Sequence, residues 1–206
     1  MKDVEPEGFR LVRYADLSKA DAKYLDSYFA QEILPLLSVM IVGRKQPFPF
    51  LKNREIYALA ILERKGKKKL GIIPCESGML PRLVALPGVP GTYILLEELI
   101  LHYAPGLFKG YKVQEKTLMR ITRNADIDVS KVYDEDLNYR DQMEQVVKLR
   151  KKLAPVRIEF TRDISQKMVG EVCDYCELDE KHVFYSKSPL DLSFVFQIQD
   201  ELRDRQ

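Results

Sequence analysis

The sequence predicts an α+β fold, with a mixed sheet of about four to five strands and helices packed on it. Two observations support this prediction. Strand-like apolar runs and helical patterns both occur, and they alternate imperfectly along the chain instead of repeating as regular strand-helix-strand units. In addition, the runs at 56–62 and 70–73 are close enough to pair as a hairpin.

The composition is that of a globular protein. The chain has 206 residues, 46% hydrophobic and 31% charged, which suits one large or two small domains and excludes wholesale disorder. Its 33 basic and 31 acidic residues leave a net charge of +2, so any attraction for a polyanion must come from local clustering. No apolar run approaches the ~20 residues needed to span a bilayer, and no signal-peptide core is present, so we expect a cytoplasmic protein.

The first predicted element is a helix from Ser18 to about residue 34. Ser18 followed by Asp21 is typical of a helix N-terminus. Pro35 should end or kink the helix. Apolar residues recur at helical spacing, at Ala22, Leu25, Phe29 and Ile33.

The stretch "PFPFLKN" that follows predicts a structured loop. The prolines forbid regular structure and the phenylalanines require burial, so we expect the loop to be held on the core. Its motif residues are Pro47, Phe48, Pro49, Phe50 and Asn53.

The hairpin comes next, and "ERKGKKK" at 63–69 gives it a positive tip. Four prolines then break the chain into short pieces, and a helix is expected at 95–103, followed by a loop at 104–111. "TLMRIT" predicts a strand, at whose end Asn124 and Asp126 are expected to form a turn.

Three helices and one strand are predicted in the rest of the chain. A helix at 134–153 begins with acidic and ends with basic residues, and "VRIEF" at 156–160 alternates like a strand. A further helix starts at Asp163 with Gln166 and runs to about Cys176. Ser188 as N-cap, Pro189 and Asp191 predict the start of the last helix.

The sequence shows no catalytic or metal site. Phosphate-binding glycine loops and hydrolase motifs are missing, and His102 and His182 have no visible partners, so surface or helix-terminal positions are favoured for both. Cys173 and Cys176 form a C-x-x-C without further zinc ligands nearby, and we interpret both as half-buried small hydrophobes on one helix face. With Cys75 they do not form the pattern of a secreted disulfide scaffold.

Basic residues cluster at three places: the hairpin tip, the Arg44-Lys45 loop, and a strand with Arg120 and Arg123 nearly in line on one face. A solvated turn is favoured for the tip. The two guanidinium groups could bind phosphate oxygens as planar forks. The favoured alternative is an ion pair from Arg123 to Asp126 or Asp128. The candidate polyanion-binding residues are Arg120, Arg123, Lys67, Lys68 and Lys69.

Six phrases in order give the chain a family resemblance. "YFAQEILPLLS", "PFPFLKN", "FKGYKV", "RITRNADIDV", "PVRIEF" and "SPLDLSFVF" together resemble the middle, or head, domain of bacterial polyphosphate kinases of the first type. The resemblance covers 9–206, after a polar lead-in at 1–8, and implies the fold of that head domain.

The resemblance also implies a function. These enzymes reversibly transfer the terminal phosphate of ATP to polyphosphate through a phosphohistidine, and their catalytic histidines, magnesium ligands and most nucleotide contacts lie in two domains that follow the head. No catalytic residue, metal or cofactor is therefore expected here, and this segment alone should be inactive, while ATP and magnesium are implied for the intact enzyme. Implied partners are the other domains, a second copy in a dimer or higher oligomer, and polyphosphate. The intact enzyme is expected in the cytoplasm, with peripheral membrane association as an open alternative.

Two alternatives concern binding without catalysis. The domain could bind polyphosphate or another polyanion by itself through the arginines and lysines named above. It could also bind nucleic acid, but its aromatic residues fall mostly at core-like positions and its net charge is low for that class.

Overall fold

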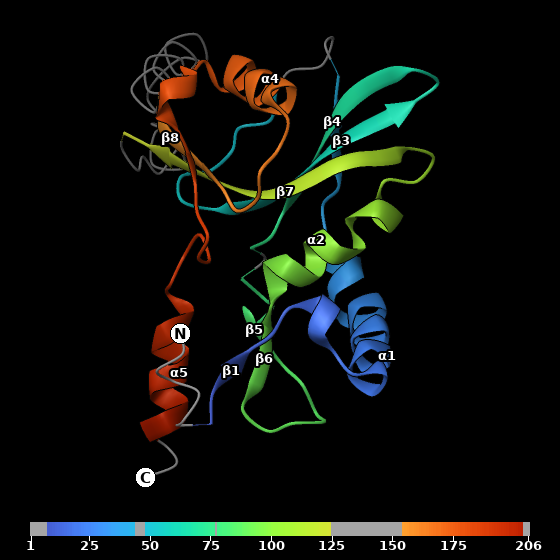
Figure 1. Cartoon of the computed structure of the whole chain (residues 1–206), viewed down its shortest axis with the longest axis vertical. Coiled ribbons are helices and arrows are strands. Elements are labelled where there is room, and N and C mark those ends of the chain that lie inside the picture. The colour runs from blue at the N-terminus through green and yellow to red at the C-terminus, as the bar shows by residue number, and fades with distance from the viewer. Residues whose placement is uncertain (1–7, 44–47, 77, 125–153, 204–206) are drawn as a thin grey trace, which may run out of the picture.

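The computed structural model describes residues 8–43, 48–76, 78–124 and 154–203. Figure 1 shows a large sheet with α4 on one side and α2 on the other, and a smaller sheet beyond α2, beside α5. The strands are β1 Arg10–Leu11, β2 Met40–Val42, β3 Ile56–Arg64, β4 Lys67–Pro74, β5 Leu83–Ala85, β6 Thr92–Leu95, β7 Lys112–Arg123, β8 Pro155–Phe160 and β9 Val183–Tyr185. The α-helices are α1 Lys19–Tyr28, α2 Leu96–Leu107, α4 Gln166–Cys176 and α5 Phe194–Arg203.

The α+β class is confirmed, and both sheets are mixed. The large sheet has the order β2-β4-β3-β7-β8-β9 and is antiparallel except at β8–β9, whose parallel pairing needs the crossover that contains α4. The small sheet has the order β1-β6-β5. The large sheet exceeds the predicted size of about four to five strands because its edge strands β2 and β9 have only three residues each, too few to show alternation.

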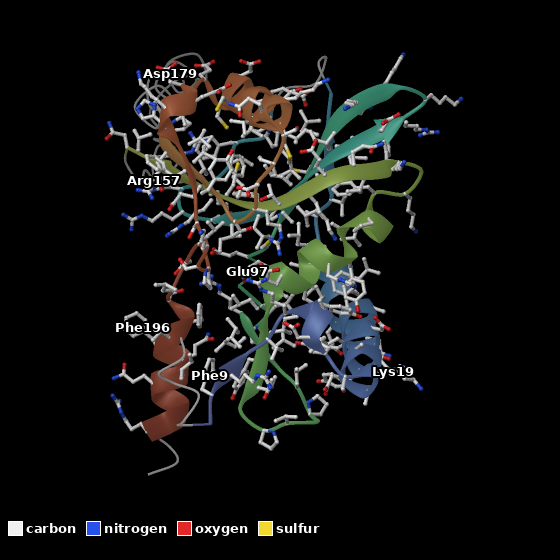
Figure 2. All side chains as sticks on the ribbon, in the orientation of Figure 1. Phe9, Lys19, Glu97, Arg157, Asp179 and Phe196 are labelled. Carbon is white, nitrogen blue, oxygen red and sulfur yellow. The ribbon has the colours of Figure 1, made fainter. Side chains whose placement is uncertain are left out.

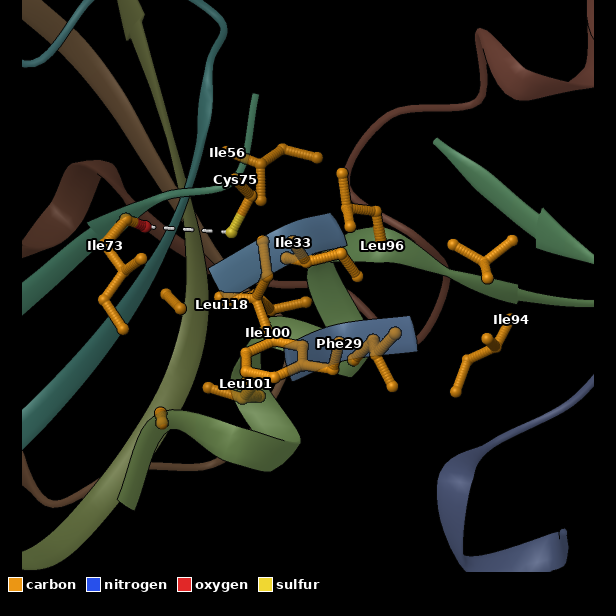
Figure 3. Close-up of a cluster of buried hydrophobic side chains, with 14 of the residues drawn as sticks. Phe29, Ile33, Ile56, Ile73, Cys75, Ile94, Leu96, Ile100, Leu101 and Leu118 are labelled. Carbon is orange, nitrogen blue, oxygen red and sulfur yellow. Dashed lines mark hydrogen bonds between the residues drawn. The ribbon is translucent and has the colours of Figure 1, made fainter. Parts of the chain in front are cut away.

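Strand β3 lies at the centre and separates two cores. Ile56 and Ala58 point to the side of α1 and α2. Figure 3 shows Ile56 there with Phe29 and Ile100. The alternate residues of β3, beginning with Tyr57, point to α4. Because both faces are covered, residues 56–62 are all buried, and the strand reads as a continuous apolar run. A third core joins α5 to the small sheet, through Phe9, Leu83, Tyr93, Leu95, Phe194 and Ile198.

The first predicted helix and the hairpin are confirmed. The Ser18 side chain caps α1 by accepting a hydrogen bond from the Asp21 backbone N–H at 3.1 Å. After α1 the chain continues in helical turns of other pitch to Leu36, so Pro35 lies where the helical path ends. The predicted helix at 134–153 lies outside the described residues.

The predicted loop at 104–111 is confirmed only at 108–111; its start is wrong, because α2 continues to Leu107 and contains Pro105. A proline inside a helix deprives the carbonyl four residues earlier of its donor. Here that carbonyl, Leu101 O, instead accepts a hydrogen bond from Lys116 Nζ at 2.8 Å. A side chain from β7 thus supplies the bond that the proline removes.

The starts of the last two helices also differ from the prediction. Ser165, rather than Asp163, caps α4, accepting from the Met168 backbone N–H at 3.3 Å. Helix α5 begins at Phe194, well after the predicted Ser188-Pro189 start. Asp191 instead accepts a hydrogen bond from the Ser193 backbone N–H at 2.6 Å and faces two arginines, so 188–191 is not helical.

Candidate functional site

Glu97 lies between the two sheets (Figure 2), and with Arg82 it forms the centre of a charged cluster. Arg82 directly precedes β5, and Glu97 lies in the first turn of α2. Arg82 Nη2 donates to Glu97 Oε1 at 2.6 Å and Nε donates to the same oxygen at 3.1 Å. Burial opposes the charge, but Glu97 holds the pKa of Arg82 above its ordinary value by hydrogen bonding and by its charge. Glu97 is only 3% exposed, so the charge of its carboxylate is balanced inside the protein.

Asp191 connects this pair to Arg120. Its Oδ1 lies 3.4 Å from Arg82 Nη1, and its Oδ2 lies 3.8 Å from Arg120 Nη2. Burial would raise the pKa of Asp191, but the Ser193 hydrogen bonds and the two arginine charges lower it below its ordinary 3.8. We call Arg82, Glu97, Arg120 and Asp191 the arginine junction. It joins β5, α2 and β7 to the segment before α5, and no unpaired nucleophile or base belongs to it.

An apolar groove of about 870 Å³ lies beside the junction. Its volume is in the range of ligand or peptide pockets. Polar side chains stand at its edge, including Glu98 and Arg162, which pair at 2.6 Å. The apolar lining includes Phe9, Leu11, Leu95, Leu192, Phe194 and Ile198. With this lining, the groove is suited to binding a partner and not to catalysis.

Arg120 and Arg123 lie on opposite faces of the large sheet, so the prediction that they share one face is wrong. Side chains alternate along a strand, and these two are three positions apart. Arg120 donates to Leu190 O at 2.8 Å and to Arg54 O at 3.1 Å, on the junction side. Arg123 Nε donates to Leu51 O at 2.8 Å, on the α4 side. Both arginines therefore fix loops to β7, and their role toward a polyanion stays a prediction.

The "PFPF" loop is held on the core as predicted, but Phe50 is not buried. Phe48 stacks on Tyr175 of α4 with ring centroids 4.8 Å apart, whereas Phe50 is 46% exposed. Its ring lies under the Arg123 guanidinium, with Cζ 4.3 Å from the centroid, and this contact takes the place of burial. Asn53 Oδ1 accepts from the Arg123 backbone N–H at 2.7 Å.

Of the remaining residues of these motifs, the structure describes Asn124 but not Pro47 or Asp126. Asn124 is exposed, and its backbone N–H donates to Ala154 O at 3.2 Å, so it lies at the end of the β7–β8 pairing. Pro47 and Asp126 lie outside the described residues, as does Asp128, the other proposed ion-pair partner of Arg123.

The histidines and cysteines show no catalytic arrangement in the part of the chain that the structure describes. His102 stacks on Tyr14, and burial together with the Lys116 charge lowers its pKa. His182 Nδ1 is buried, and it has no hydrogen-bond partner among the described residues. Burial raises the pKa of the Cys176 thiol to about 12, which opposes thiolate chemistry.

The remaining cysteines agree with this picture. Cys75 and Cys173 are also buried, and all three thiols are free. No group of His, Cys, Asp and Glu able to hold a metal occurs among the described residues. Within those same residues, no helix is both long and apolar enough to cross a bilayer.

Sequence reasoning missed Arg82 and Glu97. Their pairing spans fifteen positions, and the contact with Asp191 is more distant still, so no local pattern reveals either. One signal was available: Glu97 interrupts the apolar run "YILLEELIL", where a buried carboxylate would need a cationic partner.

Comparison with known proteins identifies the family. The family model described as the polyphosphate kinase middle domain matches residues 20–198. Relatives named polyphosphate kinase include one from Bacillus anthracis, 32% identical over 208 residues, and one from Mycolicibacterium paratuberculosis, 30% identical over 207. These alignments cover 97% and 94% of this chain but only 29% and 28% of the relatives, so the chain spans less than a third of their length.

A solved structure agrees at the level of the fold. The crystal structure of polyphosphate kinase from Porphyromonas gingivalis superposes with a TM-score of 0.68 at 22% identity, over 90% of this chain and 26% of that one. Matches of the family model and of relatives above 30% identity, each over most of the chain, show that this chain belongs to the polyphosphate kinase family and corresponds to its middle domain.

Proposed function

We propose that this chain is the head domain of an enzyme that reversibly transfers the terminal phosphate of ATP to polyphosphate, using magnesium. Within that enzyme, the domain serves dimer assembly and forms part of the wall of the active-site tunnel, while the chemistry occurs elsewhere. The length of the relatives supports a larger enzyme around this domain. A cytoplasmic location, with or without peripheral membrane association, stays a prediction.

The observation that carries the assembly role is an exposed apolar stripe at the C-terminal end of the described chain. Leu192, Val195 and Phe196 are 55%, 48% and 69% exposed, and they lie together at the start of α5, Leu192 just before the helix and the other two in its first turn. The other side of α5 is anchored, because Phe194 and Ile198 are buried on the small sheet. Figure 2 shows Phe196 on the outer side of α5. Clustered exposed apolar residues of this kind mark a contact surface.

The stripe also borders the groove, since Leu192 and Val195 line both. Stripe and groove therefore form one continuous apolar surface. Two copies related by a two-fold axis could each place this same surface against the other, as an isologous interface needs. We therefore assign the stripe to contact between two copies of this domain.

Sedimentation equilibrium of the chain tests this assignment. The unaltered chain should form a dimer, and Val195→Ser/Phe196→Ser should shift it to monomer. Met79→Ser is the control, since Met79 is 73% exposed and lines a second pocket that shares no residue with the groove beside the stripe. A chain that stays monomeric up to its solubility limit, or a double variant that dimerises normally, would contradict self-association.

The predicted inactivity has its own test. Incubated with ATP, magnesium and polyphosphate, the chain should transfer no phosphate in either direction, because its described histidines lack the surroundings of a phosphate acceptor. Time-dependent formation of ADP with elongation of the polyphosphate would contradict this prediction.

A second candidate function is polyanion binding by the domain itself. One observation favours it: the lysines at the β3–β4 tip have no carboxylate partner among the described residues. Arg120→Ala/Arg123→Ala is a poor test, because these side chains donate to Leu190 O and Leu51 O and their loss would disturb the fold. The hairpin is the better place to test binding.

A further inference from the structure

The β3–β4 hairpin closes through a tight turn that places like charges opposite each other. Lys65 and Gly66 have φ of 50° and 72°, as in the two-residue turns that suit hairpins. Arg64 consequently pairs directly with Lys67 across the ladder. Opposed like charges destabilise a strand pair, so this closing pair weakens the hairpin that carries it.

The positive charge extends to the neighbouring loop between α2 and β7. Lys112 pairs with Glu63 in the ladder, which brings this loop beside the hairpin. Glu63 stands opposite Lys68 as well as Lys112 in the ladder, but its carboxylate accepts a hydrogen bond from Gln114 Nε2 at 2.7 Å and forms no ion pair with the described lysines. Seven cations therefore share this end of the sheet without a described carboxylate partner: Arg64, Lys65, Lys67, Lys68, Lys69, Lys109 and Lys112.

Tyr111 holds two of these cations in place. Arg64 Cζ and Lys69 Nζ lie 5.6 Å and 5.8 Å from its ring centroid. A hydrogen bond from Lys69, then the Lys69 and Arg64 charges, lower the pKa of the phenol. Such contacts hold long side chains that would otherwise sample many rotamers, so part of the cationic surface is ordered before any ligand arrives.

We propose that these seven cations form a binding site for polyphosphate at the end of the sheet, which we call the hairpin site. Arg64, Lys67 and Lys69 lie on the face of the sheet that carries Tyr111, and Lys68 and Lys112 lie on the opposite face, so the polymer would cross the edge formed by the hairpin tip. The choice of polyphosphate among polyanions rests on the proposed function. The site has no group that could carry out phosphate transfer, so it holds a segment of the polymer away from the chemistry.

The side chains around the site favour a bare phosphate chain over other polyanions. Single-stranded nucleic acids are bound by cations together with exposed aromatic faces on which bases stack. None of the exposed large hydrophobic side chains of the described residues belongs to 63–69 or 109–112, and the Tyr111 ring already contacts two cations. Without exposed large hydrophobic side chains, this part of the described chain also lacks the apolar residues that would insert into a membrane surface.

A salt-resolved titration of the 206-residue chain with medium-length polyphosphate tests the hairpin site. The variant is Lys67→Gln/Lys68→Gln/Lys109→Gln, since all three side chains are exposed. Lys19→Gln/Lys23→Gln/Lys167→Gln is the control, because it removes the same charge from exposed positions on α1 and α4. At low salt the hairpin variant should bind at least about 10-fold more weakly and lose about 2 to 3 from the log–log salt slope, while the control changes less than about 2-fold.

Three results would overturn the proposal: no salt-sensitive binding by the unaltered chain, equal losses in the two variants, or equally tight binding of a charge-matched single-stranded RNA that the hairpin variant also loses. Unfolding curves of both variants check that the fold is intact. Their sedimentation separates the two proposals, since the hairpin variant should still dimerise. If the unaltered chain dimerises but the hairpin variant binds polyphosphate as tightly as the unaltered chain, only the hairpin site is contradicted. If the unaltered chain is a monomer but its binding is lost in the hairpin variant, only the assembly role is contradicted.

Discussion

Two guanidinium nitrogens of Arg82 reach the carboxylate of Glu97, at 2.6 Å and 3.1 Å from Oε1. The pair fixes the start of β5 to the first turn of α2. The side chains of Arg82 and Glu97 are only 16% and 4% exposed, so water cannot replace either charge as the partner of the other.

Glu97→Gln should therefore lower the free energy of unfolding by about 3 kcal/mol, because it leaves the buried Arg82 without its main counter-charge. The neighbouring Glu98→Gln is the control. Its partner Arg162 is 41% exposed, and pairs of that kind contribute less than about 1 kcal/mol. Denaturant unfolding of both variants measures the difference, and equal effects would show that the Arg82–Glu97 pair has no special weight.

Asp191 predicts a pH dependence of stability. Its folded-state pKa is below the ordinary 3.8, so its charge stabilises the fold above that pH, and the contribution disappears as the pH falls through the folded pKa. Asp191→Asn should therefore be less stable than the unaltered chain at pH 7, with the gap narrowing below about pH 4. Thermal unfolding across this range tests it, and a gap that stays constant down to pH 2 would argue against a role for the charge.

Helix α4 ends at a residue in a conformation that favours glycine. Glu177 has φ of 53°, and the Leu178 backbone N–H donates to Cys173 O at 3.0 Å, as in the common glycine-terminated helix ending. Glu177→Gly should raise the free energy of unfolding by about 1 kcal/mol, since glycine adopts this conformation without the steric cost. Glu171→Gly in the middle of the same helix should do the opposite. Calorimetry of both variants would show whether the two effects have opposite signs.

Gly71 of β4 leaves room for an aromatic ring. A Cβ added there would lie 2.5 Å from Phe108 Cζ, and Phe108 is fully buried beneath the sheet. Gly71→Ala should destabilise the protein by about 1 to 3 kcal/mol through this overlap. Adding Phe108→Leu should cost less in the Gly71→Ala background than in the unaltered chain. A double-mutant cycle measures this coupling, and strict additivity would mean that the two side chains do not compete for space.

Local patterns in the sequence predicted the elements whose interactions are local. The hairpin follows from two apolar runs and a glycine turn, and the Ser18 cap from residues three apart. The start of α5 could not be predicted in this way. The Ser188-Pro189 pattern is a good helix start by itself, but Asp191 is held by Arg82, which is remote in sequence.

The same distinction applies to the candidate sites. The basic hairpin tip is contiguous in sequence and was recognised, whereas Lys109 and Lys112 reach it only through the pairing of β3 with β7. The arginine junction was missed because its four members come from four parts of the chain that only the fold brings together. Arg120 and Arg123 were singled out as candidates for polyanion binding, which stays a prediction. The carbonyls that they bind come from loops whose positions no local pattern reveals.

The third core constrains the order in which the newly made chain can fold. Phe9, near the start, packs with Phe194 and Ile198, near the end, and with Tyr93 between them. During synthesis the strands of the large sheet can pair as they leave the ribosome, but this face of the small sheet stays uncovered until α5 has been translated. For that interval the nascent chain exposes Leu83 and Leu95, and apolar surface exposed in this way is prone to aggregation.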